Sequence, residues 1–199
     1  MRISFYILTL LLLSSFSPPE APAVAHLTYA IKRDGKVVGQ IKASRTIQGS
    51  KTYYEVETHM EIKVIVTQNI DYSSKAFYED GVLQSCVSKS YLNQKLHNSC
   101  TTVLRGNRYE IKNDNAVSYI KKPVYYSGVM LYFKEPGNAS LVYSEMSGQE
   151  NYMRKKAAAQ YILTNSKSRK QNRYYYKNSF LDRAYIDHSM VDLEIQRVN

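Results

Sequence analysis

Several residue types that build chemical sites are scarce in this chain. Its 199 residues include two cysteines, four histidines and no tryptophan. We expect no metal site and no cofactor, because the histidines show none of the paired spacings that metal sites use. A surface position is the simpler explanation for each of them: His26, His59, His97 and His188.

Motifs of catalysis and of nucleotide binding are missing as well. No glycine-rich loop matches a nucleotide-binding fingerprint. The segment Asp187-His188-Ser189 has the residue types of a nucleophilic triad, but neighbours on an extended chain point to opposite faces and do not converge. Three glutamates share one expected strand face, where solubilising charge explains them better than acid–base chemistry: Glu55, Glu57 and Glu61. We therefore expect no catalytic residues and a protein that is not an enzyme.

Long apolar runs are absent except near the beginning of the chain. Arg2 provides a positive start, residues 5–13 are apolar, and Ala23-Val24-Ala25 has the small-x-small form of a cleavage site. The apolar run is shorter than the about 20 residues that a membrane-spanning helix needs. We expect a signal peptide at residues 1–25, cleavage near Ala25, and a secreted or periplasmic protein. No cysteine directly follows this site, which argues against a lipid anchor.

Acidic residues are fewer than basic ones. Lysine and arginine number 27 against 17 aspartates and glutamates, which gives a formal net charge of +10. Such a surplus favours anionic surfaces such as lipid headgroups or acidic glycans, although it also serves simply to keep a protein soluble. We do not expect nucleic acid as a partner, because an exported protein rarely meets it. The densest basic and aromatic segment supplies the surface candidates: Lys167, Arg169, Lys170, Arg173 and Tyr175.

The clearest structural pattern lies between Tyr53 and Val66. Alternate positions are apolar and only Thr58 interrupts them, whereas the positions between are mostly charged or polar. Strict alternation predicts a strand with one buried and one solvent-exposed face. Because ordinary strands have about 5–6 residues, we expect this longer one to bend across a strongly curved sheet.

Turn signals divide the rest of the chain into further strands. Asp34-Gly35 and Asp80-Gly81 are strong hairpin signals, and abundant tyrosine, 19 residues in all, also favours strands. The segment 127–133 is ambiguous: a serine precedes an apolar run that fits either a short helix or a buried strand. The sequence predicts an all-β fold, a single strongly curved antiparallel sheet or barrel-like meander over residues 26–199, with at most one short helix.

The two cysteines fall in one predicted hairpin. Cys86 and Cys100 lie seven residues before and after Asn93, in the middle of the polar tip 93–95. A hairpin centred on Asn93 would place the two cysteines opposite each other, within disulfide distance. Export to an oxidising compartment favours the bond, so we predict a disulfide. The alternative is a pair of free, buried thiols.

Four groups of residues occur together in this chain: Tyr29-x-Ile31 with Gly35-x-x-x-Gly39, Phe77-x-x-x-Gly81-x-Leu83-x-Ser85, Leu131-Tyr132-Phe133-x-Glu135-Pro136, and Tyr174-Tyr175-Tyr176-Lys177-Asn178. The set resembles secreted bacterial all-β proteins that are known only as a domain of unknown function. More loosely, it is similar to curved-sheet proteins of the lipoprotein-carrier type, which bind acyl chains in a half-open barrel. The resemblance covers nearly all of the expected mature chain. It implies a possible lipid ligand and no catalytic residue.

Our leading hypothesis is a cavity for an apolar, lipid-like ligand on the concave face of the sheet. The candidate lining residues are Tyr54, Val56, Met60, Ile62, Val64, Tyr125, Tyr126, Met130 and Phe133. Curved sheets of about eight strands either hold one small ligand or fill with side chains, so a solid core is the competing interpretation. The alternative function is an interaction module for an acidic glycan, an anionic surface or an envelope protein. Tyrosines that point inward would favour a ligand or a core, and outward tyrosines a recognition surface.

Overall fold

A computed structural model describes residues 21–63, 66–114, 116–187 and 191–198. The first eight strands in these residues follow one another through short connections: β1 (Ala23–Arg33), β2 (Lys36–Gln48), β3 (Lys51–Lys63), β4 (Thr67–Glu79), β5 (Val82–Leu92), β6 (Lys95–Arg105), β7 (Arg108–Asn113) and β8 (Ala116–Ile120). A short 3-10 helix and six more strands follow: η1 (Gly128–Tyr132), β9 (Leu141–Ser144), β10 (Gln149–Ala157), β11 (Gln160–Thr164), β12 (Gln171–Lys177), β13 (Phe180–Asp187) and β14 (Asp192–Arg197). Most of the expected signal peptide and Val64 lie outside the described residues.

All of these strands belong to one antiparallel sheet. Its order is β8-β7-β6-β5-β4-β3-β2-β1-β14-β13-β12-β11-β10-β9, and it is not closed into a barrel. The chain therefore forms two meanders that meet where β14 returns to pair with β1, for example Ile31 with Ile195. The predicted all-β fold and single curved antiparallel sheet are confirmed. β1 begins at Ala23, so it includes the small residues of the expected cleavage site.

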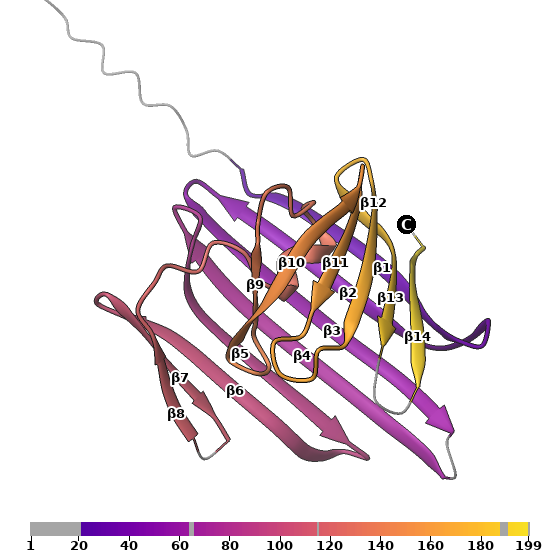
Figure 1. Ribbon diagram of the computed structural model, residues 1–199. Coiled ribbons are helices and arrows are strands. Elements are labelled where there is room, and N and C mark those ends of the chain that lie inside the picture. Colours follow the sequence, from indigo (N-terminus) through magenta and orange to yellow (C-terminus); the bar gives the residue numbers. More distant parts are fainter. Residues whose placement is uncertain (1–20, 64–65, 115, 188–190, 199) are drawn as a thin grey trace, which may run out of the picture.

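The sheet curves until its two meanders face each other. In Figure 1, β9–β12 lie in front of the long strands β2–β5, and a 2.6 Å hydrogen bond joins Thr102 Oγ1 on β6 to the Tyr143 hydroxyl on β9. Bulges shift the strand register after Ile31 on β1, after Phe77 on β4 and at three further places. Each bulge bends its strand and increases the local twist. The bulges therefore give a physical reason for the curvature that the long alternating strand predicted.

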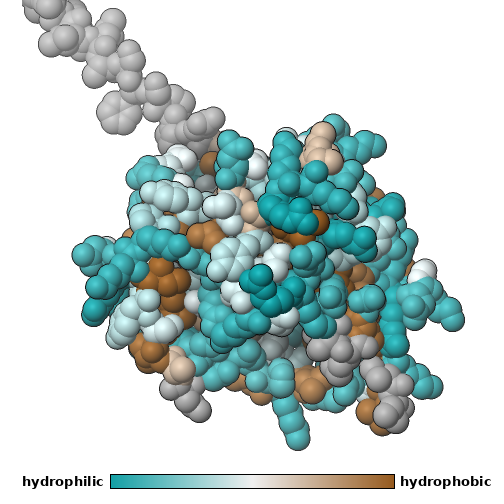
Figure 2. All heavy atoms as spheres, viewed as in Figure 1, coloured by the Kyte–Doolittle hydropathy of each residue, from teal (hydrophilic) through white to brown (hydrophobic). Residues whose placement is uncertain are grey.

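The two faces of the long strands differ as the alternation predicts. Tyr54 and Val56 of β3 are buried on the concave face, whereas Glu55 lies on the convex face with its Oε1 2.5 Å from Lys75 Nζ. Figure 2 shows that hydrophilic side chains dominate the outer surface in this view, with apolar side chains between them. Gly39 lies opposite Met60, where a Cβ would come 2.3 Å from the His59 carbonyl oxygen. A glycine is needed there because the two backbones approach so closely.

The ambiguous segment 127–133 is helical. η1 lies in the space between the two meanders and buries Val129, Met130 and Leu131. Ser127 precedes the helix but does not cap it with its side chain, because the hydroxyl instead accepts a 2.6 Å hydrogen bond from the Tyr78 hydroxyl. Within the described part of the chain, no helix has the length and apolar character to cross a bilayer.

The predicted disulfide is wrong: Cys86 and Cys100 are both free thiols, and both are buried. The hairpin turns at Asn93-Gln94, with Leu92 opposite Lys95, and a bulge after Ser90 shifts the register again. Cys86 therefore lies opposite Thr102, and Cys100 opposite Ser88. The two sulfurs occupy diagonal positions on the inner face, where Cα separations are typically about 7–8 Å. The structure has the alternative arrangement, a pair of free, buried thiols.

Candidate functional site

The concave face holds an apolar compartment beside η1. Its volume is about 520 Å³, and it is lined by the far ends of the long strands together with β13, β14 and Tyr132. Most of the lining side chains are aliphatic, among them Ile31, Met60, Ile62, Ile70, Leu92 and Ile195. Among the described residues, none of those that line it comes from β9–β12. The compartment therefore lies where the covering strands end.

Unequal strand lengths produce this opening. β3 and β4 have 13 residues each, whereas β9, β11 and β12, which lie in front of the long strands (Figure 1), have 4, 5 and 7. The long strands therefore extend beyond the shorter strands that face them. Along one row of β3, Tyr54, Val56 and Ile62 are buried, whereas Met60 is only half-buried. Ile70 of β4 lies opposite Met60 and is also half-buried.

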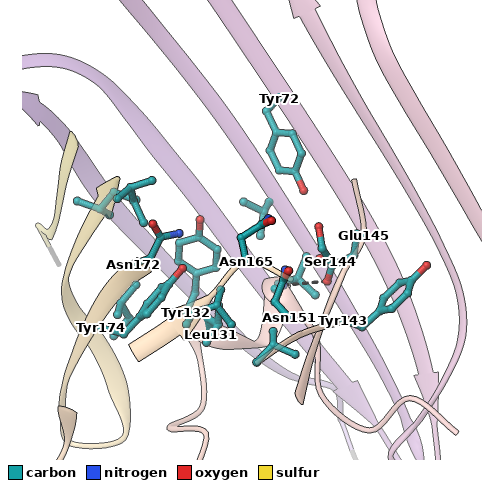
Figure 3. A pocket seen from close by; sticks show the side chains of 18 residues that line it. Tyr72, Leu131, Tyr132, Tyr143, Ser144, Glu145, Asn151, Asn165, Asn172 and Tyr174 are labelled. Atoms are coloured by element: carbon teal, nitrogen blue, oxygen red, sulfur yellow. Dashed lines mark hydrogen bonds between the residues drawn. The ribbon is translucent and has the colours of Figure 1, made fainter. Parts of the chain in front are cut away.

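A polar compartment of about 300 Å³ adjoins the apolar one. The two share four lining residues, Tyr72, Tyr132, Ile186 and Ile195. Figure 3 shows the polar compartment between the long strands and the opposite meander, with Glu145, Asn151, Asn165, Asn172 and Tyr174 around it. An apolar compartment and a hydrogen-bonding compartment therefore lie side by side on the concave face.

Glu145 directly follows β9 and is the buried acid of the polar compartment. Its side chain is almost completely buried, and Oε1 accepts a 2.9 Å hydrogen bond from the Val129 N–H at η1. A Cβ on Gly128 would lie 2.7 Å from Oε2, so glycine lets the helix approach the carboxyl group. Burial raises the pKa of Glu145, and hydrogen bonds from Ser127 and from backbone N–H groups partly offset that rise.

Glu145 has no cationic partner within the described residues. None of the ion pairs found there includes it, and no lysine or arginine contributes to its pKa shift. A buried carboxyl group without a counter-charge favours its uncharged form, which can donate as well as accept a hydrogen bond. In Figure 3 one carboxyl oxygen of Glu145 faces the space toward which the Tyr72 hydroxyl points.

Tyrosine hydroxyls contribute neutral donors to the same space. Burial raises the pKa of Tyr174 to about 12, and it raises the pKa of Tyr72 still further with help from the nearby Glu145. Both phenols therefore keep their protons at ordinary pH. Beside Tyr72, Ser74 and Ser88 share a 2.8 Å hydrogen bond between their hydroxyls across β4 and β5. This inner strip of the long strands is polar but uncharged.

Three asparagines are oriented by hydrogen bonds to the backbone. The side-chain oxygen of Asn151 accepts the Ser166 N–H at 3.1 Å, and that of Asn172 accepts the Asp187 N–H at 3.0 Å. Asn165 accepts two N–H groups of its own turn at 3.0 and 2.8 Å. Because each oxygen is engaged, the amide nitrogen is the donating end, and that of Asn172 already bonds the Tyr174 hydroxyl. With the tyrosines, the polar compartment is rich in N–H and O–H donors.

The predicted lining residues divide into three groups. Met60 and Ile62 line the apolar compartment, and Val56 lines the polar one. Other candidates belong to the filled part of the interior: Tyr54, Tyr126, Met130 and Phe133. Tyr125 is 63% exposed and points away from the interior, and Val64 lies outside the described residues.

The predicted surface candidates lie away from the compartments. Lys167 and Arg169 are exposed in the turn before β12, and Lys170 pairs with Asp187 at 3.2 Å. Arg173 places its guanidinium 5.1 Å from the centre of the Tyr185 ring. Tyr175 meets the same ring edge-on at 5.9 Å. The structure thus brings Arg173 and Tyr175 together on one side of β12–β13.

Sequence reasoning missed the polar compartment. Glu145 gave a weak signal, as a single acid within the apolar segment 141–146, but its environment depends on η1. The asparagines gave none, because their role depends on turns that only the fold brings together. The direction of the tyrosines is clearer: the largest fully buried side chains include Tyr29, Tyr78, Tyr109, Tyr143 and Tyr161. Inward tyrosines favour a ligand site or a core, as stated above.

Residues 29–198 match the family model described as Domain of unknown function (DUF6134). The match covers most of the chain, which therefore belongs to this family. No curated protein and no solved structure matches the chain.

Proposed function

We propose that this DUF6134 protein is a non-enzymatic, exported protein that binds an apolar, lipid-like molecule on the concave face of its sheet. The observation that carries this proposal is the apolar compartment beside η1. Its volume of about 520 Å³ falls within the range of about 300–1,000 Å³ that ligand sites commonly have. Each methylene buried there would contribute about 0.8 kcal/mol to binding.

The competing interpretation, a sheet filled by its own side chains, describes only one part of the concave face. Around Tyr54 the interior is closed, since Phe133 lies with its ring centre 5.7 Å away. Around Met60 and Ile70 the same face stays half-buried and borders the compartment. Apolar side chains that a fold leaves uncovered are typical of binding sites.

The loosely similar lipoprotein carriers hold acyl chains in a half-open barrel whose cup is usually filled by helices. Here, among the described residues, η1 is the one short helix that could fill the cup. The chain therefore departs from the carrier pattern, and the proposal rests on the compartment beside η1 rather than on this resemblance.

A binding titration that compares the wild-type protein with a single-residue variant tests the proposal. N-phenyl-1-naphthylamine fluoresces when it enters an apolar site, and we expect saturable binding to the wild-type protein. Ile70→Glu places a carboxylate in the apolar compartment and should weaken binding at least about tenfold, because the charge loses its hydration there. Val37→Glu is the matched control, since Val37 is 65% exposed.

Two results would contradict the proposal. One is a wild-type protein that does not bind the dye saturably. The other is equal binding by Ile70→Glu and Val37→Glu. Circular dichroism of both variants shows whether each has kept the sheet, and Met60→Gln serves as a milder variant if Ile70→Glu unfolds.

A second candidate function is recognition of an acidic glycan or an anionic partner through β12–β13. Arg173 favours it, because this cation packs on Tyr185 rather than against a carboxylate. However, neighbouring cations are already paired, Arg183 with Glu194 at 3.3 Å and Lys170 with Asp187. Retention on immobilised heparin that falls in Arg173→Ala at low salt would support this candidate. Equal retention of both proteins would exclude it.

A further inference from the structure

The apolar and polar compartments adjoin each other. Tyr72, Tyr132, Ile186 and Ile195 line both, so these four residues form their common boundary. A molecule in the apolar part therefore lies next to the hydrogen-bonding part at this boundary. Their adjacency raises the question of which chemical group the polar compartment recognises.

The polar compartment lacks the cationic groups that would neutralise an anionic ligand. Among the described residues that line either compartment there is no lysine, arginine or aspartate, and Glu145 is the single acid. His97, which borders the apolar compartment, is exposed to solvent. A phosphate or sulfate head would lose its hydration without gaining a counter-charge, which is strongly unfavourable.

The polar compartment instead presents hydrogen-bond donors. The oxygens of Asn151 and Asn165 are held by backbone N–H groups, which leaves their amide nitrogens to donate, whereas Asn172 already bonds the Tyr174 hydroxyl. The hydroxyls of Tyr72 and Tyr174 add neutral donors. The complementary partner carries uncharged oxygen acceptors, as an ester, a carbonyl or a hydroxyl group does. A quaternary ammonium head, which has no oxygen or lone pair to accept these hydrogen bonds, complements this set poorly.

We propose that the polar compartment receives the uncharged, oxygen-bearing head of a single-chain amphiphile whose tail lies in the apolar compartment. This inference rests on the proposed function, because the tail site is the apolar compartment itself. Glu145 serves as a hydrogen-bond partner of the head. Tyr72 lies at the junction and contacts the part of the ligand where head and tail meet.

Amphiphiles with the same tail and different heads test the head group. We use 1-monolauroylglycerol, dodecyl sulfate and dodecyltrimethylammonium, each below its micellar concentration, to displace N-phenyl-1-naphthylamine. We expect the uncharged glyceride to compete at concentrations at least about tenfold lower than either charged compound. A charged head would lose its hydration in the compartment without gaining a counter-charge. Equal competition by all three, or preference for a charged head, would overturn the head-group proposal.

A pair of tyrosine variants locates the head within the protein. Tyr72→Phe removes one hydroxyl from the junction and should weaken glyceride binding about three- to tenfold, as expected for one lost hydrogen bond. Tyr91→Phe is the matched control, because Tyr91 lines only the apolar compartment.

The outcomes separate the two proposals. If the wild-type protein binds neither dye nor amphiphile, the proposed function is wrong and the head-group proposal falls with it. If the dye binds but Tyr72→Phe and Tyr91→Phe have the same glyceride affinity as wild type, the lipid site stands and the head-group assignment is wrong. A selective loss in Tyr72→Phe supports both.

Discussion

The two ends of the concave face are built from the same strands and differ in what covers them. Near Tyr54 and Tyr78, whose rings meet edge-on at 5.7 Å, the segment around η1 and the strands β9–β12 close the interior. Near Met60 and Ile70, the facing strands are too short to reach, and an apolar compartment remains. The comparison teaches that the alternation of a strand decides which face is apolar, whereas a distant segment decides whether that face becomes core or cavity.

Truncating one side chain at the closed end and one at the open end of the concave face gives the largest expected difference in stability. Phe133 is 2% exposed and packs on Tyr54, so Phe133→Ala should lower the free energy of unfolding by about 3–5 kcal/mol. Met60→Ala should cost about 1 kcal/mol or less, because the half-buried side chain borders space that is already open. Urea unfolding of both variants measures the difference. Equal losses would show that the two ends are packed alike.

The pH dependence of stability distinguishes the buried acid from the exposed acids. Because the pKa of Glu145 is raised in the folded protein, the folded state binds its proton more tightly than the unfolded chain does. The contribution of Glu145 to the free energy of unfolding is greatest at pH values below its ordinary pKa, and it declines as the pH rises through the folded-state pKa. Glu145→Gln removes this dependence. We therefore expect the free energy of unfolding of the wild-type protein, minus that of Glu145→Gln, to be larger near pH 4 than near pH 8.

Urea midpoints of both proteins at several pH values between 4 and 8 check this direction. Glu57→Gln is the control, since Glu57 is an exposed residue of the convex face. An unchanged difference between wild type and Glu145→Gln across the range would show that Glu145 is not held in its uncharged form. Such a result would also weaken the head-group proposal.

Local patterns were enough to predict much of the fold. The alternation after Tyr53 identified β3 and its inner row, because the side-chain direction of a strand depends on position alone. Asp34-Gly35 and Asp80-Gly81 marked two hairpins that the structure has. The cysteine register failed because the hairpin turns at Asn93-Gln94 rather than at Asn93 alone, and because the bulge after Ser90 shifts the pairing by one further residue.

The candidate site was only partly predictable. Met60 and Ile62 were identified from the apolar row, but the same row gave Tyr54, which belongs to the closed end. The distinction depends on where the covering strands β9–β12 end, and these strands come much later in the chain than β3. The role of Glu145 could not be predicted, because it depends on the close approach of η1 at Gly128, and no spacing in the sequence reveals that contact.

Native mass spectrometry tests the central claim, that the open end of the concave face holds a lipid-like ligand. The protein is purified without detergent, incubated with a bacterial lipid extract and sprayed under native conditions beside Ile70→Glu and Val37→Glu. The account predicts a stoichiometric adduct in the lipid mass range for wild type and Val37→Glu, and its loss in Ile70→Glu. A wild-type protein that remains free of any adduct, or an adduct that all three proteins retain equally, would contradict the account.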